Sequence, residues 1–337
     1  MATVVPSVQV VPARTPRRRR IRRIALGLLA LPFALALLGL VYETGMAATD
    51  ARRYPPLGRL VDVGGHRLHL HCTGTGSPTV VLEGGKGLTT LHWSLVQPQL
   101  ATETRVCAYD RAGQGWSEPG PLPRTPERVV EELHTLLQAA GESGPYVLAG
   151  HSLGGRYVRL FAARYPEEVA GLVLVDARSE YHDQHVTPAM KAQMAAQNTP
   201  GPEIGPMRRL GLLRLFAAPI STASDPEAAL LPRQTLKAIM VQSVRPAALT
   251  AGQSEFVEME RSDGLLQKSS LGDLPLRVLA SDQASTVDPL WMKGQEDQAA
   301  RSTNSTLRLL PGNHYLMYGN AEAVVGAVRE VLQLPMR

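Results

Sequence analysis

The chain has 337 residues, of which 44% are hydrophobic and 19% are charged, and its formal net charge is +5. A chain of this length can enclose the core of one large globular domain. Nine Arg in residues 1–53 stand against Glu43 and Asp50, so this segment carries +7 and the remainder carries −2. Because the excess basic charge is confined to the N-terminal segment, the composition argues against a nucleic-acid-binding protein.

A basic cytoplasmic tail is predicted over residues 1–23, followed by a transmembrane helix over residues 24–42. The arginine cluster RRRRIRR directly precedes the uncharged apolar run IALGLLALPFALALLGLVY, and about 20 apolar residues span the hydrocarbon core of a bilayer. The arginines are expected to stay in the cytoplasm, so we predict a single-pass cell-membrane protein with an extracytoplasmic domain. The alternative is a signal peptide cleaved near the small residues of GMAA, which would release a secreted protein.

A linker is predicted over residues 43–56, where a Pro-Pro pair favours an extended chain. The domain predicted over residues 57–335 opens with a hairpin-like pair and then alternates apolar runs with helical segments, among them a helix that starts at Thr125 and stops at Gly141. The apolar runs, each expected to be a buried strand, are PTVVLEGG, TRVCAYD, PYVLAG, VAGLVLVD, LPLRVLAS and STLRLLPG. This alternation indicates an α/β fold with a mainly parallel sheet covered on both faces.

Residues 178–270 interrupt the alternation. They are rich in Pro, Gln and Met and contain short helical pieces without a convincing strand pattern. An insertion of this size inside an α/β domain is typical of a cap over a site. Its Met and Leu residues are compatible with an apolar pocket, although such residues more often serve packing.

A nucleophile is predicted at Ser152, which lies in the pattern G-x-S-x-G of GHSLGG between an apolar strand and a helix. Such a turn strains the serine backbone and exposes its hydroxyl at the carboxyl edge of the sheet, at a helix N-terminus. Serine also needs a base. His314 is expected to be that base, because it follows the last apolar run and precedes the closing helix.

An oxyanion formed at this serine needs two backbone N–H donors. One is expected from Leu153, which directly follows the nucleophile. The other is expected from the loop after VVLEGG, where Gly85 is the preferred residue and Lys86 the alternative. Backbone donors make the glycines of this loop more important than the side chains around them.

The segments GHSLGG, YDRAGQGWS and PPLGRLVDVGGHRLHLHCTG together resemble the α/β-hydrolase superfamily, and most closely its bacterial membrane-anchored or secreted serine hydrolases and esterases. The resemblance extends over roughly residues 55–335 and is weakest in the cap. It implies an eight-stranded, mostly parallel sheet of order 1-2-4-3-5-6-7-8, with helices on both faces and a helical cap. It also implies Ser–His–acid chemistry without a cofactor or metal, on a small-molecule acyl substrate.

The implied strand order makes strands 2 and 4 neighbours, and these strands carry Cys72 and Cys107. We expect two unpaired thiols, because neighbouring strands rarely meet the geometry of a disulfide. A single cross-strand bridge is the alternative, and an extracytoplasmic domain would permit it.

Two aspartates compete for the acid of the triad. Most of the superfamily places the acid after strand 7, where Asp282 directly follows LPLRVLAS. Some relatives place it after strand 6, where VLVDA puts Asp176, and the branch that this chain resembles often carries an acid only there. We expect Asp176, with Asp282 as the alternative and Asp288 or Glu180 as further acids.

The working hypothesis is a carboxylesterase- or lipase-like serine hydrolase that cleaves an acyl bond, most often a carboxylic ester, through an acyl-enzyme. A serine aminopeptidase or a haloperoxidase-like enzyme of the same fold is the alternative. From another class, a non-catalytic ligand-binding protein of this fold is considered. The serine–histidine pair argues against it.

Overall fold

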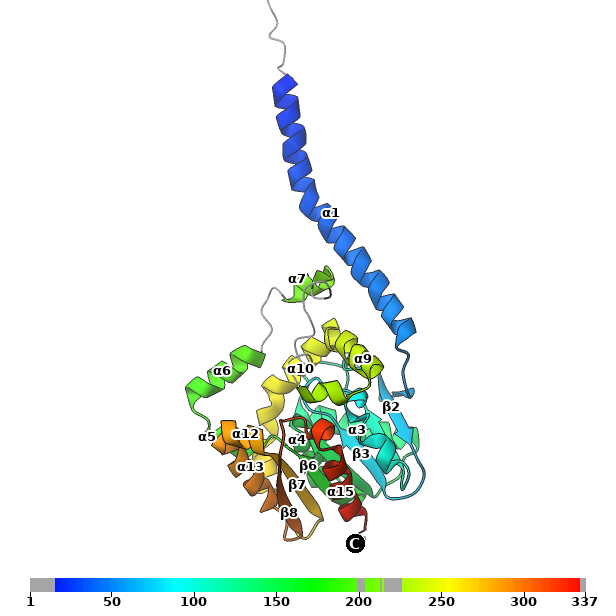
Figure 1. Cartoon of the computed structure of the whole chain (residues 1–337), viewed down its shortest axis with the longest axis vertical. Coiled ribbons are helices and arrows are strands. Elements are labelled where there is room, and N and C mark those ends of the chain that lie inside the picture. The colour runs from blue at the N-terminus through cyan, green and yellow to red at the C-terminus, as the bar shows by residue number, and fades with distance from the viewer. Residues whose placement is uncertain (1–15, 199–203, 213, 215–225, 334–337) are drawn as a thin grey trace, which may run out of the picture.

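The chain forms a layered body from which one long helix extends (Figure 1), in a computed structural model that describes residues 16–198, 204–212, 214 and 226–333. The body is built on an eight-stranded sheet of order β1-β2-β4-β3-β5-β6-β7-β8. The pairs β1–β2 and β2–β4 are antiparallel, and the other neighbours are parallel. The expected mainly parallel sheet and its strand order are confirmed.

The strands of this sheet are short. Their bounds are β1 (Arg59–Asp62), β2 (Arg67–Thr73), β3 (Thr79–Glu83), β4 (Val106–Tyr109), β5 (Tyr146–His151), β6 (Val169–Val175), β7 (Leu276–Ser281) and β8 (Ser305–Leu310). Every residue of β3, β4, β5 and β7 is buried, because helices cover both faces of these central strands. This explains why their sequences are apolar throughout instead of alternating.

Helices pack on both faces of the sheet, and further helices form the insertion. Their bounds are α2 (Gln97–Leu100), α3 (Pro126–Ala140), α4 (Leu153–Arg164), α5 (Glu180–His185), α6 (Pro188–Asn198), α7 (Ile204–Arg209), α9 (Arg233–Ser243), α10 (Pro246–Glu258), α11 (Asp263–Lys268), α12 (Asp282–Val287), α13 (Pro289–Ala299), α14 (Leu316–Gly319) and α15 (Ala321–Leu332). Along β3, Val81 packs with side chains of α3 and α4, whereas Val80 and Leu82 pack with those of α15. Successive strand residues point to opposite faces, so each face has its own hydrophobic core.

The helix α3 shows how local sequence sets these boundaries. The Thr125 side chain accepts a hydrogen bond from the backbone N–H of Arg128, and Pro126 occupies the first turn. The helix ends at Gly141, whose φ of 74° lies in the left-handed region that glycine adopts without strain. Both ends lie where the sequence predicts them.

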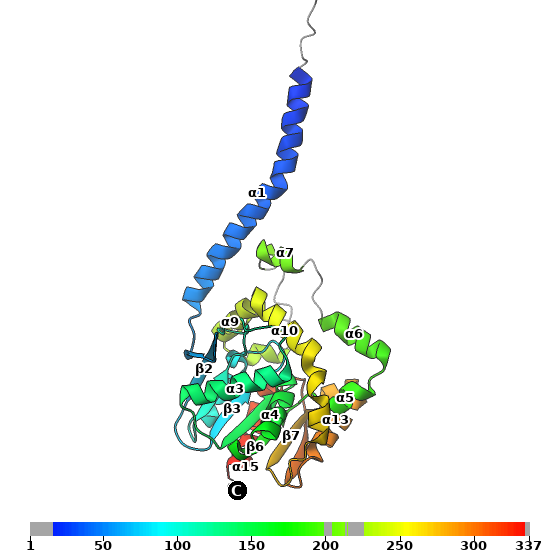
Figure 2. The same cartoon turned by 180° about the vertical axis from the view of Figure 1, so that it is seen from behind.

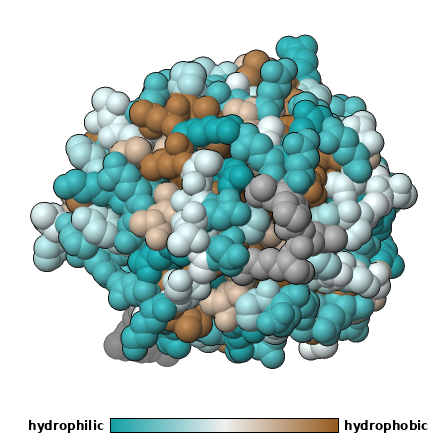
Figure 3. All heavy atoms as spheres, turned by 90° about the horizontal axis from the view of Figure 1, so that it is seen from below, coloured by the Kyte–Doolittle hydropathy of each residue, from teal (hydrophilic) through white to brown (hydrophobic). Residues whose placement is uncertain are grey.

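The insertion over residues 178–270 is helical in its described part, with α5, α6, α7, α9, α10 and α11 and no strand. In Figures 1 and 2, α9 and α10 lie over the end of the body from which the long helix extends. The opposite end, seen in Figure 3, is covered mainly by hydrophilic residues with smaller apolar patches between them.

The long N-terminal helix, α1 (Pro16–Arg53), contains an apolar window with a mean hydropathy of 2.6 and no buried residue. It is long and apolar enough to cross a membrane, and a signal sequence has the same properties. The segment 43–56 differs from the expected extended linker, since α1 continues to Arg53. Seven of residues 43–53 are Glu, Met, Ala or Arg, which favour helix, and the Pro-Pro pair at 55–56 follows the end of the helix instead of shaping the whole segment.

Cys72 and Cys107 form a disulfide, so the expectation of two unpaired thiols is wrong. The two residues are direct partners in the antiparallel register of β2 and β4, and their Cα atoms lie 4.0 Å apart. Residues directly opposite each other in such a pair approach closely at alternate positions. Strand order alone does not reveal this register, and the register is what permits the bridge.

We expect the double variant Cys72→Ala/Cys107→Ala to lower the free energy of unfolding by about 2–4 kcal/mol, because the bridge restricts the unfolded chain. The bridged residues are separated by 35 positions in the sequence. Urea unfolding of the full chain in detergent micelles, followed by tryptophan fluorescence, measures the difference. Reducing agent should destabilise the wild type and leave the double variant unchanged; a wild type insensitive to reduction would contradict the bridge.

Candidate active site

Ser152 lies at the tight turn between β5 and α4, with φ of 52° and ψ of −120°. The surrounding backbone is packed so closely that side chains are excluded. A Cβ on Gly150 would lie 2.6 Å from the carbonyl oxygen of Gly154, and one on Gly155 would lie 2.3 Å from the Cβ of Ala177. The glycines of GHSLGG are therefore required on steric grounds, and the turn holds Ser152 at the carboxyl end of β5.

Asp176 directly follows β6, and its side chain is fully buried. One oxygen, Oδ2, lies 2.6 Å from Nδ1 of His314. The other, Oδ1, accepts hydrogen bonds of 2.9 Å from the backbone N–H of Ser281 and from Nε1 of Trp291. The carboxylate is thus fixed by β7 and α13 while its second oxygen faces the histidine.

His151 fixes the backbone of the loop that carries His314. The Nε2 of His151 donates to the backbone oxygen of His314 at 2.9 Å, and the two rings lie 4.7 Å apart. Burial lowers the pKa of His151 well below its ordinary value, so this imidazole is neutral and one ring N–H is available for the bond. His314 itself is about one-third exposed, at 32% of its side chain.

The other candidate acids are engaged elsewhere. Asp282 begins α12, and its Oδ1 accepts a hydrogen bond of 3.0 Å from the backbone N–H of Gly312. Asp288 caps α13 and lies 2.7 Å from Nε2 of His182, and Glu180 forms a buried ion pair with Arg159. Of the four acids considered from the sequence, the structure brings Asp176 to His314.

The two expected oxyanion residues lie next to Ser152. Leu153 is the first residue of α4 and is buried. Gly85 follows β3, the neighbour of β5, and a Cβ at this position would come within 3.1 Å of the Cβ of Ser152. Ser152, Leu153 and Gly85 therefore meet at the carboxyl edge of the sheet.

The buried side chain of Arg111 holds the loop that contains Gly85. Its guanidinium donates to the carbonyl oxygens of Gly84 and Gly85, each at 2.6 Å. It also pairs with Glu83 of β3, and with both oxygens of Glu255 of α10 at 3.0 Å. Burial raises the pKa of Glu83 to about 6, and the charge of Arg111 opposes this rise. Arg111 thus ties the sheet, the loop and the cap together.

Trp291 packs against His314, and His182 packs against Trp291. The indole of Trp291 packs edge-on against His314 at 5.4 Å and against His182 at 5.3 Å. No motif marks Trp291 or Glu255 in the sequence. The sequence indicates a role for Arg111 only weakly, because Arg111 is a charged residue inside YDRAGQGWS, close after a buried strand.

The comparisons with known proteins agree with this fold. A sequence model of the family described as the alpha/beta hydrolase fold matches residues 78–320. The chain belongs to the α/β-hydrolase family.

Curated relatives match this chain over part of its length. An uncharacterised protein of Schizosaccharomyces pombe is 38% identical over an alignment of 143 residues that covers 34% of this chain and 26% of that protein. The 2-hydroxy-6-oxo-2,4-heptadienoate hydrolase of Pseudomonas putida is 37% identical over 124 residues, 36% of this chain and 45% of the enzyme. The matched regions span less than half the length of either relative.

Solved structures resemble this chain over a larger share of its length. The enol-lactonase from Burkholderia xenovorans covers 82% of it with a TM-score of 0.61 and 20% identity, and all of the enol-lactonase is matched. An esterase from Thermogutta terrifontis covers 82%, with a TM-score of 0.60, 23% identity and 97% of the esterase matched. At these identities the likeness concerns the fold.

Lys86, the alternative oxyanion residue, turns toward the cap. Its ammonium lies 4.8 Å from the centre of the Phe256 ring, and the guanidinium of Arg178 lies 5.4 Å from the same ring. Burial lowers the pKa of Lys86 to about 8. The side chain of Lys86 therefore belongs to the contact between loop and cap.

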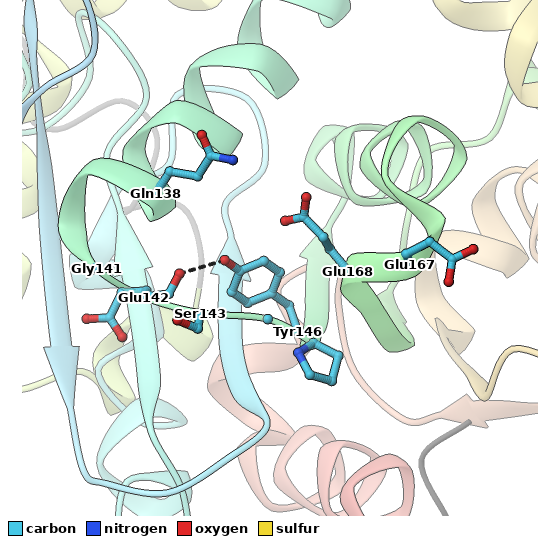
Figure 4. Close-up of a pocket in the computed structure, with 9 residues that line it drawn as sticks. Gln138, Gly141, Glu142, Ser143, Tyr146, Glu167 and Glu168 are labelled. Carbon is cyan, nitrogen blue, oxygen red and sulfur yellow. Dashed lines mark hydrogen bonds between the residues drawn. The ribbon is translucent and has the colours of Figure 1, made fainter.

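A hollow of about 440 Å³ lies elsewhere on the molecule, between the end of α3 and residues 167–168 (Figure 4). The hydroxyl of Tyr146 donates to the backbone oxygen of Glu142 at its wall. Tyr146 begins β5, whereas Ser152 follows the end of that strand. The hollow therefore opens at the opposite edge of the sheet and is separate from the candidate site.

We expect Arg111→Gln to destabilise the hydrolase by about 3–5 kcal/mol, because Glu83 and Glu255 would remain buried without their cation. The matched control is Arg67→Gln, since Arg67 pairs with Glu118 on the exposed surface, where ion pairs contribute little. Thermal unfolding of both variants measures the difference. Equal losses of stability in the two variants would contradict a special role for Arg111.

Proposed function

We propose that this α/β-hydrolase is a serine hydrolase that cleaves an acyl bond, most often a carboxylic ester. The observation that carries the proposal is the 2.6 Å contact between the buried carboxylate of Asp176 and Nδ1 of His314, at the sheet edge where the turn presents Ser152. A carboxylate at Nδ1 selects the tautomer whose Nε2 lone pair accepts a proton. Ser152 is then the nucleophile, His314 the base and Asp176 the acid.

The reaction follows from these roles. The Oγ of Ser152 attacks the acyl carbon while its proton passes to Nε2 of His314. The backbone N–H groups of Leu153 and Gly85 stabilise the oxyanion, and the tetrahedral intermediate collapses as the leaving alcohol takes the proton from His314. Water, deprotonated by His314, then attacks the acyl-enzyme, and the carboxylic acid leaves as Ser152 recovers its proton.

Some structural neighbours have names that support hydrolysis of an ester bond, whereas others of similar likeness are an epoxide hydrolase and a bromoperoxidase. The Pseudomonas putida relative is a hydrolase by name, and the structural neighbours include an esterase and an enol-lactonase. A lactone is a cyclic ester, so both neighbours act on the same bond type. This agrees with the proposed assignment to a serine esterase.

We also propose that α1 is a signal anchor that keeps the arginine cluster in the cytoplasm and the hydrolase domain outside it. The asymmetry of positive charge around the apolar run supports this orientation. The Cys72–Cys107 disulfide supports it independently, because disulfides persist in oxidising compartments and are rare in the cytosol.

We expect a fluorophosphonate probe to label the wild-type chain and to fail with Ser152→Ala, because the probe reacts with an activated serine hydroxyl. Ser143→Ala is the matched control, since Ser143 lines the hollow at the other edge of the sheet and should label like the wild type. In-gel fluorescence measures the labelling. A wild-type protein that never labels would overturn the proposed enzyme.

We expect Asp176→Asn to lower kcat/KM for a p-nitrophenyl ester by about 10³–10⁴, because the amide no longer selects the productive tautomer of His314. Asp282→Asn should stay near wild type, since the amide oxygen still accepts the hydrogen bond from the backbone of Gly312. Steady-state kinetics of the two isosteric variants measure the difference. The reverse pattern would assign the acid role to Asp282.

A further inference from the structure

The helix α1 is longer than a bilayer requires. It runs to Arg53, whereas its apolar run ends at Tyr42. At 1.5 Å per residue, the last eleven residues extend the helix by about 16 Å beyond that run. This extension carries the carboxylates of Glu43 and Asp50, and it faces the hydrolase body (Figure 1).

A segment of the cap is attached to this extension by one arginine. The guanidinium of Arg214 donates to both oxygens of Glu43, each at 2.9 Å, and also pairs with Asp50. The three side chains are largely buried by one another, with exposures of 12–25%. A bidentate pair of this kind fixes orientation as well as distance.

The same segment also contacts the apolar part of α1. A Cβ on Gly39 would lie 2.5 Å from the carbonyl oxygen of Leu210, and one on Gly211 would lie 2.8 Å from the ring of Tyr42. Figures 1 and 2 both show α7 beside α1 at this level. If the apolar run spans the bilayer, the end of α7 lies at the boundary between the bilayer and water.

The composition of this segment fits that boundary. Among the side chains of residues 204–212 that the structure describes, those of Met207, Leu210 and Leu212 are apolar and partly buried, that of Arg209 is basic and exposed, and none is acidic. Apolar side chains enter the edge of the acyl region, and arginines bind anionic lipid headgroups. Arg214 pairs with Glu43 and Asp50, and these ion pairs hold the segment at the level of the boundary between bilayer and water.

The segment belongs to the same insertion that covers the candidate active site. In that insertion, α10 packs on the loop after β4, where Nε2 of Gln114 donates to the backbone oxygen of Ala248 at 3.2 Å. Glu255 of α10 binds Arg111, which holds the loop of Gly85. The cap therefore lies between the membrane boundary and Ser152.

We propose that residues 204–212 dock on the membrane surface and that the substrate is an acyl lipid drawn from the bilayer into the site beneath the cap. The proposal rests on the serine hydrolase function and the membrane anchor proposed above. It assigns the docking surface to a lipid bilayer, with Arg214 as the clamp that orients the cap toward it.

The docking surface is tested without catalysis. The fluorophore NBD is attached to Met207→Cys in the Ser152→Ala background, and the full chain is reconstituted in vesicles of phosphatidylcholine and phosphatidylglycerol. Brominated lipids should quench the label at position 207 and leave a label at Ser143→Cys unquenched, because Ser143 lies at the other edge of the sheet. An unquenched label at position 207, as expected if the segment binds a protein partner, would overturn the docking surface.

The substrate class is tested by comparing two esters in the same vesicles, a long-chain fluorogenic acyl lipid and water-soluble p-nitrophenyl acetate. Arg214→Ala and Met207→Asp should each lower turnover of the lipid about fivefold and leave turnover of the acetate unchanged, because the first change releases the segment from Glu43 and Asp50 and the second places a charge at the apolar edge of the bilayer. Met190→Asp, at an exposed apolar residue of α6, is the control and should affect neither ester.

Each outcome of this comparison decides one of the proposals. Equal losses on both esters, or no loss on either, would overturn the lipid substrate while leaving the serine hydrolase in place. A wild type that hydrolyses neither ester and does not react with fluorophosphonate would overturn the serine hydrolase, and with it the substrate class. The quenching experiment tests the docking surface independently of both the substrate class and the serine hydrolase, because it uses the Ser152→Ala variant.

Discussion

The guanidinium of Arg111 binds Glu83 and the carbonyl oxygens of the two residues that follow it, and it also binds Glu255 of α10, which lies 144 residues from Arg111 in the sequence. An unsatisfied buried carbonyl costs about 1–3 kcal/mol and an unpaired buried charge costs more. The loop after β3 therefore keeps its shape only while Arg111 is in place. Glu83 also accepts a hydrogen bond from the hydroxyl of Tyr109. The sheet, the loop and the cap are therefore joined by one continuous set of buried hydrogen bonds and ion pairs.

The same principle positions the histidine. Asp176 is oriented by Ser281 and Trp291, and the loop of His314 is held by His151. Each of these partners comes from a different element, so no single loop carries the site. A contact of this kind resists the movement of any one segment, which is what a preorganised site requires.

The features readable from the sequence were those that depend on local steric rules. The apolar runs predicted the strands. The glycines of GHSLGG predicted the turn at Ser152, because larger residues beside it would clash with the backbone. The sequence did not decide between Asp176 and Asp282 as the partner of His314, because both follow neighbouring strands. The contact that orients Asp176 comes from Trp291, which lies 115 residues away in the sequence. The Cys72–Cys107 bridge depends on register, which strand order does not determine.

The conformation of Ser152 has a consequence for evolution and engineering. Glycine adopts a φ of 52° with ψ of −120° freely, whereas any other residue holds it at a cost of about 1–3 kcal/mol. A search for thermostable variants that scores only the melting temperature would therefore favour glycine at position 152 and discard the hydroxyl. The substitution that relieves this backbone strain would thus remove the hydroxyl that the proposed reaction uses.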